Sequence, residues 1–400
     1  MENNRIKGNL LYGQGGGPTS VINTSAYGLF VEAFKHNEIE HVFAAKNGIV
    51  GILADDLYEV ENNDYLKNLT STPGAAFGSA RVKLKSFEED KDTYYKILEI
   101  FKKNNIRFFF FNGGNDSMDT IDKISNFFLK EGYDCRCIGI NKTVDNDLMN
   151  TDFCLGFGSA AKFIANTVME IALDDSSYKQ GRINIIEVMG RHAGWLAAAG
   201  ILPAAKGIKP DFIFVPEVPF DMDEVLPKIK KCYEEKKHCI IVASEGLKDK
   251  NGNFLFEANG TVDNFGHKQL GGLSIGLANL FQEKLGAKTR YYELSLLQRA
   301  TEQNTSRIEK KIAQELSAFA LNKAINGTTN KVAVIKRLNT EPYEYDFDLV
   351  DISTIANEER MLPEEYIDRE NFTIKESFLE YGLPLIDGKD GLIDYFKIDK

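Results

Sequence analysis

The sequence predicts an α/β protein with mostly parallel sheets sandwiched by helices. Short apolar runs repeatedly lead into longer segments of helical periodicity, as in 9–13 before 20–36 and 106–111 before 117–130. This alternation is typical of βαβ units, in which a helix connects two parallel strands. The chain has 400 residues, 43% of them hydrophobic, so it can bury more than one core. We therefore expect two domains, possibly three.

The alternation continues to about residue 339. It predicts strands at 135–140, 183–188, 212–215, 238–243 and 331–336, and helices at 158–173, 194–202, 223–237 and 272–285. Beyond residue 339 the pattern fails, and the chain becomes rich in Tyr, Glu and Asp. We interpret residues 341–400 as a C-terminal extension.

Composition excludes several classes of partner. The net charge of -11 and the pI near 5.2 oppose broad attachment to nucleic acid or to anionic lipid, which needs a basic surface. The longest apolar runs, such as 108–111, are far shorter than the roughly 20 residues of a membrane helix. The first residues lack the features of a signal peptide. We expect a cytoplasmic protein with no nucleic-acid partner and no membrane span.

Cysteines and histidines lack the spacing of a zinc site. The five cysteines include no CxxC pair, and the five histidines are scattered along the chain. The cysteines are interpreted as structural, reduced thiols. A magnesium ion brought in with phosphates stays open.

Glycine-rich loops follow two of the predicted strands, and a third such loop lies at 73–81. In open parallel sheets, ligands bind beyond the carboxyl ends of strands. Gly15 to Gly17 stand between a strand and a helix, where bare backbone can approach a phosphate; an ordinary tight turn is the alternative. The loop 73–81 ends in Arg81, which can be a surface arginine instead. In the loop 112–117, Asp116 can lie beside magnesium and phosphates or act as a helix N-cap.

Two further loops carry charged groups. Lys142, Asp145 and Asp147 fall within six residues after a strand, so this loop can supply a base, a metal ligand and a phosphate clamp, or be a polar turn. Arg182 and Arg191 stand near the two ends of another predicted strand, and their planar guanidinium groups suit phosphate recognition.

Taken in order, these segments resemble the phosphofructokinase family across nearly the whole chain up to residue 340. The resemblance rests on the segments 16–23, 74–81, 113–117, 142–147 and 187–191, followed by 216–217 and 298–299. It implies two phosphofructokinase-like domains. One, of residues 1–155 and 298–340, would bind the phosphoryl donor, and the other, of residues 156–297, would bind fructose 6-phosphate.

The resemblance also implies residue roles. Asp145 would be the general base for the sugar 1-hydroxyl, Arg191 would stabilise charge on the moving phosphoryl group, and Asp147 would help to hold Mg²⁺. Arg182 would come from a neighbouring subunit, so a homo-oligomer, a dimer or tetramer, would share its active sites. The other implied residues bind the donor (Gly16, Gly17, Arg81, Gly114, Asp116, Lys142), the sugar phosphate (Thr143, Met189, Gly190, Glu217, Arg290, Arg299) or the metal (Asn115, Asp116).

Two positions indicate the donor. ATP-using members of the family carry glycine where this chain has Asp116 and Lys142, and both residues match the pyrophosphate-using branch. A carboxylate near the α-phosphate position opposes ATP by about 4 kcal/mol for unit charges about 4 Å apart at an effective dielectric of about 20. That energy corresponds to roughly a thousandfold discrimination.

Three departures from the family pattern keep alternatives open. Asn115 replaces an acid, Leu296 replaces a sugar-contacting His or Tyr, and 300–306 lacks the glycines that often follow the Gln-Arg pair. An ATP-dependent 6-phosphofructokinase and a catalytically weak regulatory or sugar-phosphate-binding subunit are the competing hypotheses. A dinucleotide oxidoreductase is disfavoured because the GxGxxG fingerprint is missing.

Overall fold

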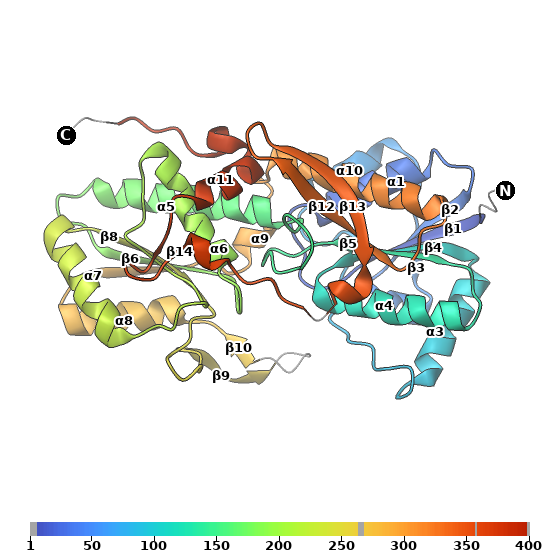
Figure 1. Cartoon of the computed structure of the whole chain (residues 1–400), viewed down its shortest axis with the longest axis horizontal. Helices are drawn as coiled ribbons and strands as arrows, with labels where there is room; N and C mark the ends of the chain where they lie inside the picture. The colour runs from blue at the N-terminus through green and yellow to red at the C-terminus, as the bar shows by residue number, and fades with distance from the viewer. Residues whose placement is uncertain (1–5, 263–267, 357, 398–400) are drawn as a thin grey trace. The chain divides into compact units, whose positions relative to one another are not determined.

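The computed structural model describes residues 6–262, 268–356 and 358–397 (Figure 1). The chain divides into two compact units, the first of Met1–Gly156 with Glu309–Glu359 and the second of Phe157–Ile308 with Arg360–Lys400. Each unit has a mostly or wholly parallel sheet flanked by helices. The predicted α/β fold class is confirmed.

The first unit is built on a seven-stranded sheet with the order β13-β12-β5-β4-β1-β2-β3. Only the edge strands β3 and β13 run antiparallel to their neighbours. The strands are β1 (Gly8–Gln14), β2 (Ile39–Ala45), β3 (Leu57–Glu59), β4 (Ile106–Gly113), β5 (Arg136–Asn141), β12 (Lys331–Asn339) and β13 (Glu344–Asp351).

Helices cover both faces of this sheet. In Figure 1, α1 and α10 lie on one face and α3 and α4 on the other. Covering on both faces explains why Phe108–Phe111 in β4 is wholly apolar and buried. The helices are α1 (Ile22–Ala33), α2 (Ile49–Ala54), η1 (Asp64–Ser71), α3 (Lys91–Lys103), α4 (Asn115–Lys130), α10 (Arg307–Ile325) and η3 (Ile352–Thr354).

The second unit is built on a parallel sheet with the order β11-β6-β8-β7. In Figure 1, α5 and α6 cover one face, and α7 and α8 cover the other. The strands are β6 (Ile183–Val188), β7 (Phe212–Phe214), β8 (Cys239–Ser244), β9 (Glu257–Val262), β10 (Lys268–Leu270), β11 (Thr289–Glu293), β14 (Ile367–Asp368) and β15 (Thr373–Ile374). The helices are α5 (Phe157–Ser176), α6 (Trp195–Ala198), η2 (Ala199–Lys206), α7 (Met222–Lys236), α8 (Leu273–Leu285), α9 (Leu297–Ala300), η4 (Glu364–Tyr366), α11 (Phe378–Gly382), η5 (Leu383–Ile386) and η6 (Gly388–Gly391).

The structure contains several elements that were not predicted, including β2, α3, β11 and α10, and two further differences concern 194–202 and the region after residue 339. The helix predicted at 194–202 is a short turn, α6, followed by the 3₁₀ segment η2, because Gly200 and Pro203 disfavour a continuous α-helix. The region after residue 339, where no strand was predicted, contains β13. In β13, Tyr345 and Phe347 lie on the α10 side, where they contact Glu315 and Phe319.

Residues 341–400 divide between the two units and do not form a separate extension. β13 pairs with β12 in the first unit, whereas the residues from 360 onward pack on the second. The hydrogen bond from Asn166 in α5 to the carbonyl of Gly391 is one such contact, at 3.0 Å. In the structure, residues 298–308 belong to the second unit, whereas the sequence analysis assigned them to the donor domain. Within the described residues, no helix combines the length and apolarity of a membrane span.

Candidate active site

The predicted glycine loops of the first unit lie at one edge of its sheet. β1, β4 and β5 are adjacent and parallel, with Tyr12 beside Phe110 and Phe110 beside Ile138. Their carboxyl ends therefore meet at the same edge. The loops 15–17, 114–116 and 142–147 follow these three ends, so the structure brings together the segments that the sequence singled out.

Lys142 joins these loops. Its side chain is 2% exposed, and its Nζ donates to the carbonyls of Gly15 and Gly17, at 2.8 Å each. Its backbone N–H donates to the carbonyl of Gly113, at the end of β4, at 3.1 Å. Lys142 therefore fixes the first glycine loop and places a positive charge within it.

The second glycine-rich loop docks on the first. Ser79 Oγ donates to the carbonyl of Gly16 at 2.6 Å, and the N–H of Phe77 donates to Gln14 Oε1 at 3.3 Å. Gly16 has a φ of +72°, a conformation that favours glycine. These contacts hold the second glycine-rich loop, which ends at the exposed Arg81, against the first glycine loop.

The loop after β4 opens α4. The N-cap of α4 is Gly114, and Asp116 lies in the first turn, so the alternative interpretation of Asp116 as the N-cap is wrong. The side chain of Asp116 is 46% exposed and lies 3.9 Å from the ammonium of Lys83. The Oδ1 atom of Asn115 is buried and has no hydrogen-bond partner among the described residues. A buried acceptor without a partner is costly, so this oxygen is suited to a ligand.

The loop after β5 holds its carboxylates by a local turn. The N–H of Asp145 donates to Thr143 Oγ1 at 3.2 Å, and Asn146, at a φ of +57°, accepts the N–H of Cys154 at 2.8 Å. Asp145 and Asp147 are half-buried and alternate with buried neighbours. The polar-turn alternative is therefore realised in this loop, and the turn also positions the two carboxylates.

The second unit gathers another set of predicted residues at the carboxyl edge of its sheet. Met189 follows β6, and its N–H donates to Gln298 Oε1 at 3.2 Å. Arg299 is the next residue after Gln298, so it lies close to the Met189 loop. Ser244, at the end of β8, donates to the carbonyl of Gly190, which has a φ of +124°.

Glu217 follows β7 at this edge. Its Oε1 accepts two backbone N–H groups, from Gly194 and Leu362, each at 2.9 Å. Its Oε2 is buried and lacks a partner within the described part of the chain. Burial raises the pKa of Glu217, while the two N–H groups and Arg369 act in the opposite direction. The Oε2 atom is therefore suited to accept a hydrogen bond from a hydroxyl group of a ligand.

Arg182 and Arg290 lie at the opposite ends of the strands of this sheet, the amino ends. Arg182 precedes the first residue of β6, and Arg290 pairs with Asn184 near the start of that strand. Met189 lies five residues after Asn184, a distance of about 16 Å along an extended strand. The sequence led us to expect Arg290 beside Met189 and Arg299. The structure instead places Arg290 near Arg182.

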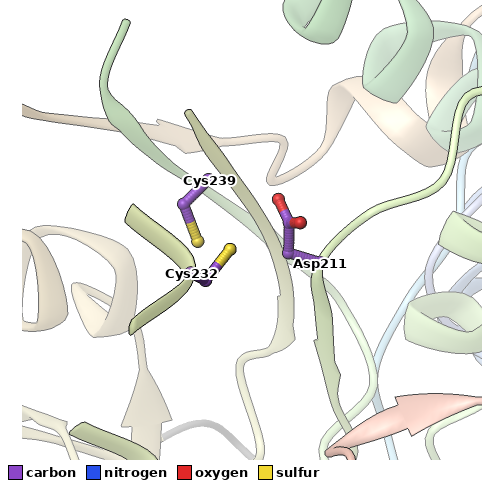
Figure 2. Close-up of side chains that lie close together, drawn as sticks. All are labelled: Asp211, Cys232 and Cys239. Atoms are coloured by element: carbon purple, nitrogen blue, oxygen red, sulfur yellow. The ribbon is translucent and has the colours of Figure 1, made fainter. Parts of the chain in front are cut away.

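A cluster that the sequence did not predict lies elsewhere in the second unit. Figure 2 shows Asp211, Cys232 and Cys239, whose ligand atoms lie within 4.8 Å of one another. Asp211 accepts hydrogen bonds from the ammonium of Lys236, at 2.5 Å, and from the N–H of Ile240, at 2.8 Å. Hydrogen bonding to Cys232, together with burial, raises the pKa of the Cys239 thiol. A protonated thiol and a lysine on the carboxylate oppose a cation, so we interpret the cluster as structural.

The fold and these loops make this an α/β protein whose glycine-rich loops lie at the carboxyl ends of parallel strands, the usual place for ligands in such folds. The chain belongs to the phosphofructokinase family, whose model, described as Phosphofructokinase, matches residues 9–323. The family predicted from the sequence motifs is therefore confirmed.

Close relatives match nearly the whole chain. A Xanthomonas campestris protein is 40% identical over 406 residues, covering 98% of this chain and 96% of the relative. A Halomonas elongata protein is 39% identical over 388 residues, covering 96% and 92%. Both are named pyrophosphate--fructose 6-phosphate 1-phosphotransferase. The crystal structure of a pyrophosphate-dependent phosphofructokinase from Nitrosospira multiformis has a TM-score of 0.86 and 34% identity, covering 98% of this chain and 94% of that one.

Proposed function

We propose that this chain transfers a phosphoryl group from pyrophosphate to the 1-hydroxyl of fructose 6-phosphate, reversibly, giving fructose 1,6-bisphosphate and phosphate. The names of the near full-length relatives support this reaction. The observation that carries the proposal is the position of Lys142, whose buried ammonium lies on the carbonyls of Gly15 and Gly17. A fixed ammonium in a glycine loop offers a point charge to pyrophosphate, which has no nucleoside to help it bind.

The donor would lie against the loops of the first unit. We assign pyrophosphate binding to Gly16, Gly17, Arg81, Gly114, Asp116 and Lys142. In this assignment, Asp116 repels the additional phosphate of ATP, because two negative charges would face each other.

Asp145 is our candidate for the general base. The sugar 1-oxygen attacks the phosphorus as its proton passes to the Asp145 carboxylate, the P–O–P bond breaks, and inorganic phosphate leaves. Arg191 and Lys142 stabilise the negative charge on the phosphoryl group as it moves.

Fructose 6-phosphate would be held by Thr143, Asp147, Met189, Gly190, Arg191, Glu217 and Arg299. The Oε2 of Glu217 has no hydrogen-bond partner among the described residues, which supports this assignment, since a buried acceptor is suited to a sugar hydroxyl. Arg182 and Arg290 lie at the other edge of the sheet, which supports their contribution to the site of a neighbouring subunit. We therefore propose a homo-oligomer, a dimer or tetramer, with shared active sites.

The donor loops also suit Mg²⁺, the proposed cofactor. Asn115, Asp116 and Asp147 would hold the ion, and the buried Oδ1 of Asn115 is an oxygen ligand of the kind that magnesium prefers. The ion would neutralise phosphate charge. We further propose a cytoplasmic location and a division of labour in which the first unit binds the donor and the second binds the sugar phosphate.

Product formation tests the reaction. Purified protein is incubated with fructose 6-phosphate, Mg²⁺ and either pyrophosphate or ATP, and fructose 1,6-bisphosphate is measured. We expect turnover with pyrophosphate alone. Turnover with ATP alone would overturn the donor assignment, and turnover with neither, in a protein that still binds fructose 6-phosphate, would favour a regulatory subunit.

A further inference from the structure

We propose that the C-terminal segment Arg360–Arg369 is a positioning element that orients Glu217 toward the sugar phosphate. The segment lies beyond residues 9–323, which the family model matches, so its role is not part of that match. The inference rests on the proposed function, because it concerns the affinity for fructose 6-phosphate.

The segment supplies half of the hydrogen bonds that fix the Glu217 carboxylate. The N–H of Leu362 reaches Oε1 at 2.9 Å, matching the N–H of Gly194 from the sheet edge. Arg369 Nη2 also donates to the Glu217 carbonyl at 3.4 Å. With both donors on Oε1, the carboxylate cannot rotate freely, and the buried Oε2 is the atom that has no hydrogen-bond partner in the described part of the chain.

The segment is itself held in place by Trp195, the residue after Gly194. The indole Nε1 donates to the carbonyl of Arg360 at 3.0 Å, and the Arg360 guanidinium lies 4.5 Å from the centre of the indole ring. Trp195 is 2% exposed and Leu362 is 3% exposed, so the connection is shielded from water. Hydrogen bonds to charged groups are stronger when water is excluded.

Removing one backbone N–H tests the proposal. Leu362→Pro deletes the donor, and Leu362→Ala keeps it while shortening the side chain. Trp195 is the only tryptophan in the chain, so its fluorescence reports fructose 6-phosphate binding in the absence of pyrophosphate. We expect Leu362→Pro to weaken fructose 6-phosphate binding by about tenfold to a hundredfold, the loss of one hydrogen bond to a charged group. The KM for pyrophosphate should stay close to that of the wild type, and Leu362→Ala should bind nearly normally.

A double-mutant cycle separates positioning from general damage. In a Glu217→Ala background, Leu362→Pro should have no further effect on fructose 6-phosphate binding, because its target carboxylate is gone. Unchanged binding by Leu362→Pro, or an equal loss for both substrates, would overturn the proposal.

If Leu362→Pro does not fold, Trp195→Phe replaces it as the test, with calorimetric titration as the measurement. This variant loses the donor to the Arg360 carbonyl and keeps an aromatic ring. It should weaken fructose 6-phosphate binding several-fold, and wild-type affinity would reject the proposal. Wild-type protein that binds no fructose 6-phosphate would instead refute the proposed function.

Discussion

The ammonium of Lys142 lies 2.8 Å from the carbonyl oxygen of Gly15, and it lies equally close to that of Gly17. An ammonium has three donors, and two of them hold the backbone of the first glycine loop. Lys142 therefore combines two tasks, since the same group shapes the loop and charges it.

Lys142→Met should impair both tasks. We expect kcat/KM for pyrophosphate to fall by at least about a hundredfold, and the free energy of unfolding to fall by about 1–3 kcal/mol because one buried and one partly buried carbonyl lose their donor. Steady-state kinetics and urea unfolding check this. Lys46→Met, at an exposed lysine paired with Asp56, serves as the control. Normal pyrophosphate kinetics in Lys142→Met would contradict the assignment.

Asp116→Gly should improve the use of ATP. The Asp116 side chain is 46% exposed, so its removal should leave the fold intact. We expect the ratio of kcat/KM for ATP to that for pyrophosphate to rise by about tenfold or more, since one opposing charge is removed. Asp122→Asn, on the same helix, is the matched control. An unchanged ratio would reject discrimination by charge at this position.

Asp145→Asn should abolish most of the catalysis while substrate binding remains. A positioned base contributes about 10²–10⁴ in rate, so kcat should fall within that range. Calorimetric titration should give fructose 6-phosphate affinity within a few-fold of wild type. A variant that keeps its kcat would show that another group accepts the proton.

Asn115 tests the proposed metal site. Its Oδ1 is buried with no hydrogen-bond partner in the described residues, so Asn115→Asp should add a charged ligand at a position already enclosed. We expect the Mg²⁺ concentration for half-maximal activity to fall in this variant and to rise in Asn115→Leu. The same concentration in all three proteins would exclude Asn115 as a ligand.

Asp387 should control stability in acid. Burial acts to raise the pKa of this carboxyl, but the Lys162 ammonium, at 2.8 Å, and the N–H groups of Ile308 and Arg307 outweigh it and lower the pKa. A lowered pKa in the folded state means that the unfolded chain binds the proton more readily. The stabilisation is therefore present above the unfolded pKa near 3.8 and is lost as pH falls through the folded pKa.

Asp387→Asn should accordingly be less stable than wild type near neutral pH, by about 1–3 kcal/mol, and should lose less stability on acidification. Urea unfolding across a pH series measures both effects. Asp390→Asn, three residues further along the chain, is the control. Parallel stability curves for wild type and Asp387→Asn would show that Asp387 does not account for the acid sensitivity.

Strand and helix positions were predictable where one apolar pattern dominated. The strand predicted at 183–188 is β6, Ile183–Val188, because a central parallel strand is buried on both faces and is therefore mostly apolar. β13 was missed, although Tyr345, Phe347 and Leu349 alternate with acids, because Asp and Glu are uncommon in strands and the acidic composition was interpreted as an extension. In the site, Lys142 was identified from the sequence, whereas its contacts with Gly15 and Gly17 were not, since they join residues more than 100 positions apart.

Periodicity and short motifs are local properties of the chain, so the amino-acid sequence was enough to identify the fold class, the family and the chemical groups at the strand ends. Which of these groups meet depends on tertiary packing. Packing brings Leu362 and Glu217, which are 145 residues apart, into a hydrogen bond. It also places Arg290 at the same end of the sheet's strands as Arg182. Strand register and the path of the C-terminal segment set these distances, and both depend on packing that no local pattern encodes.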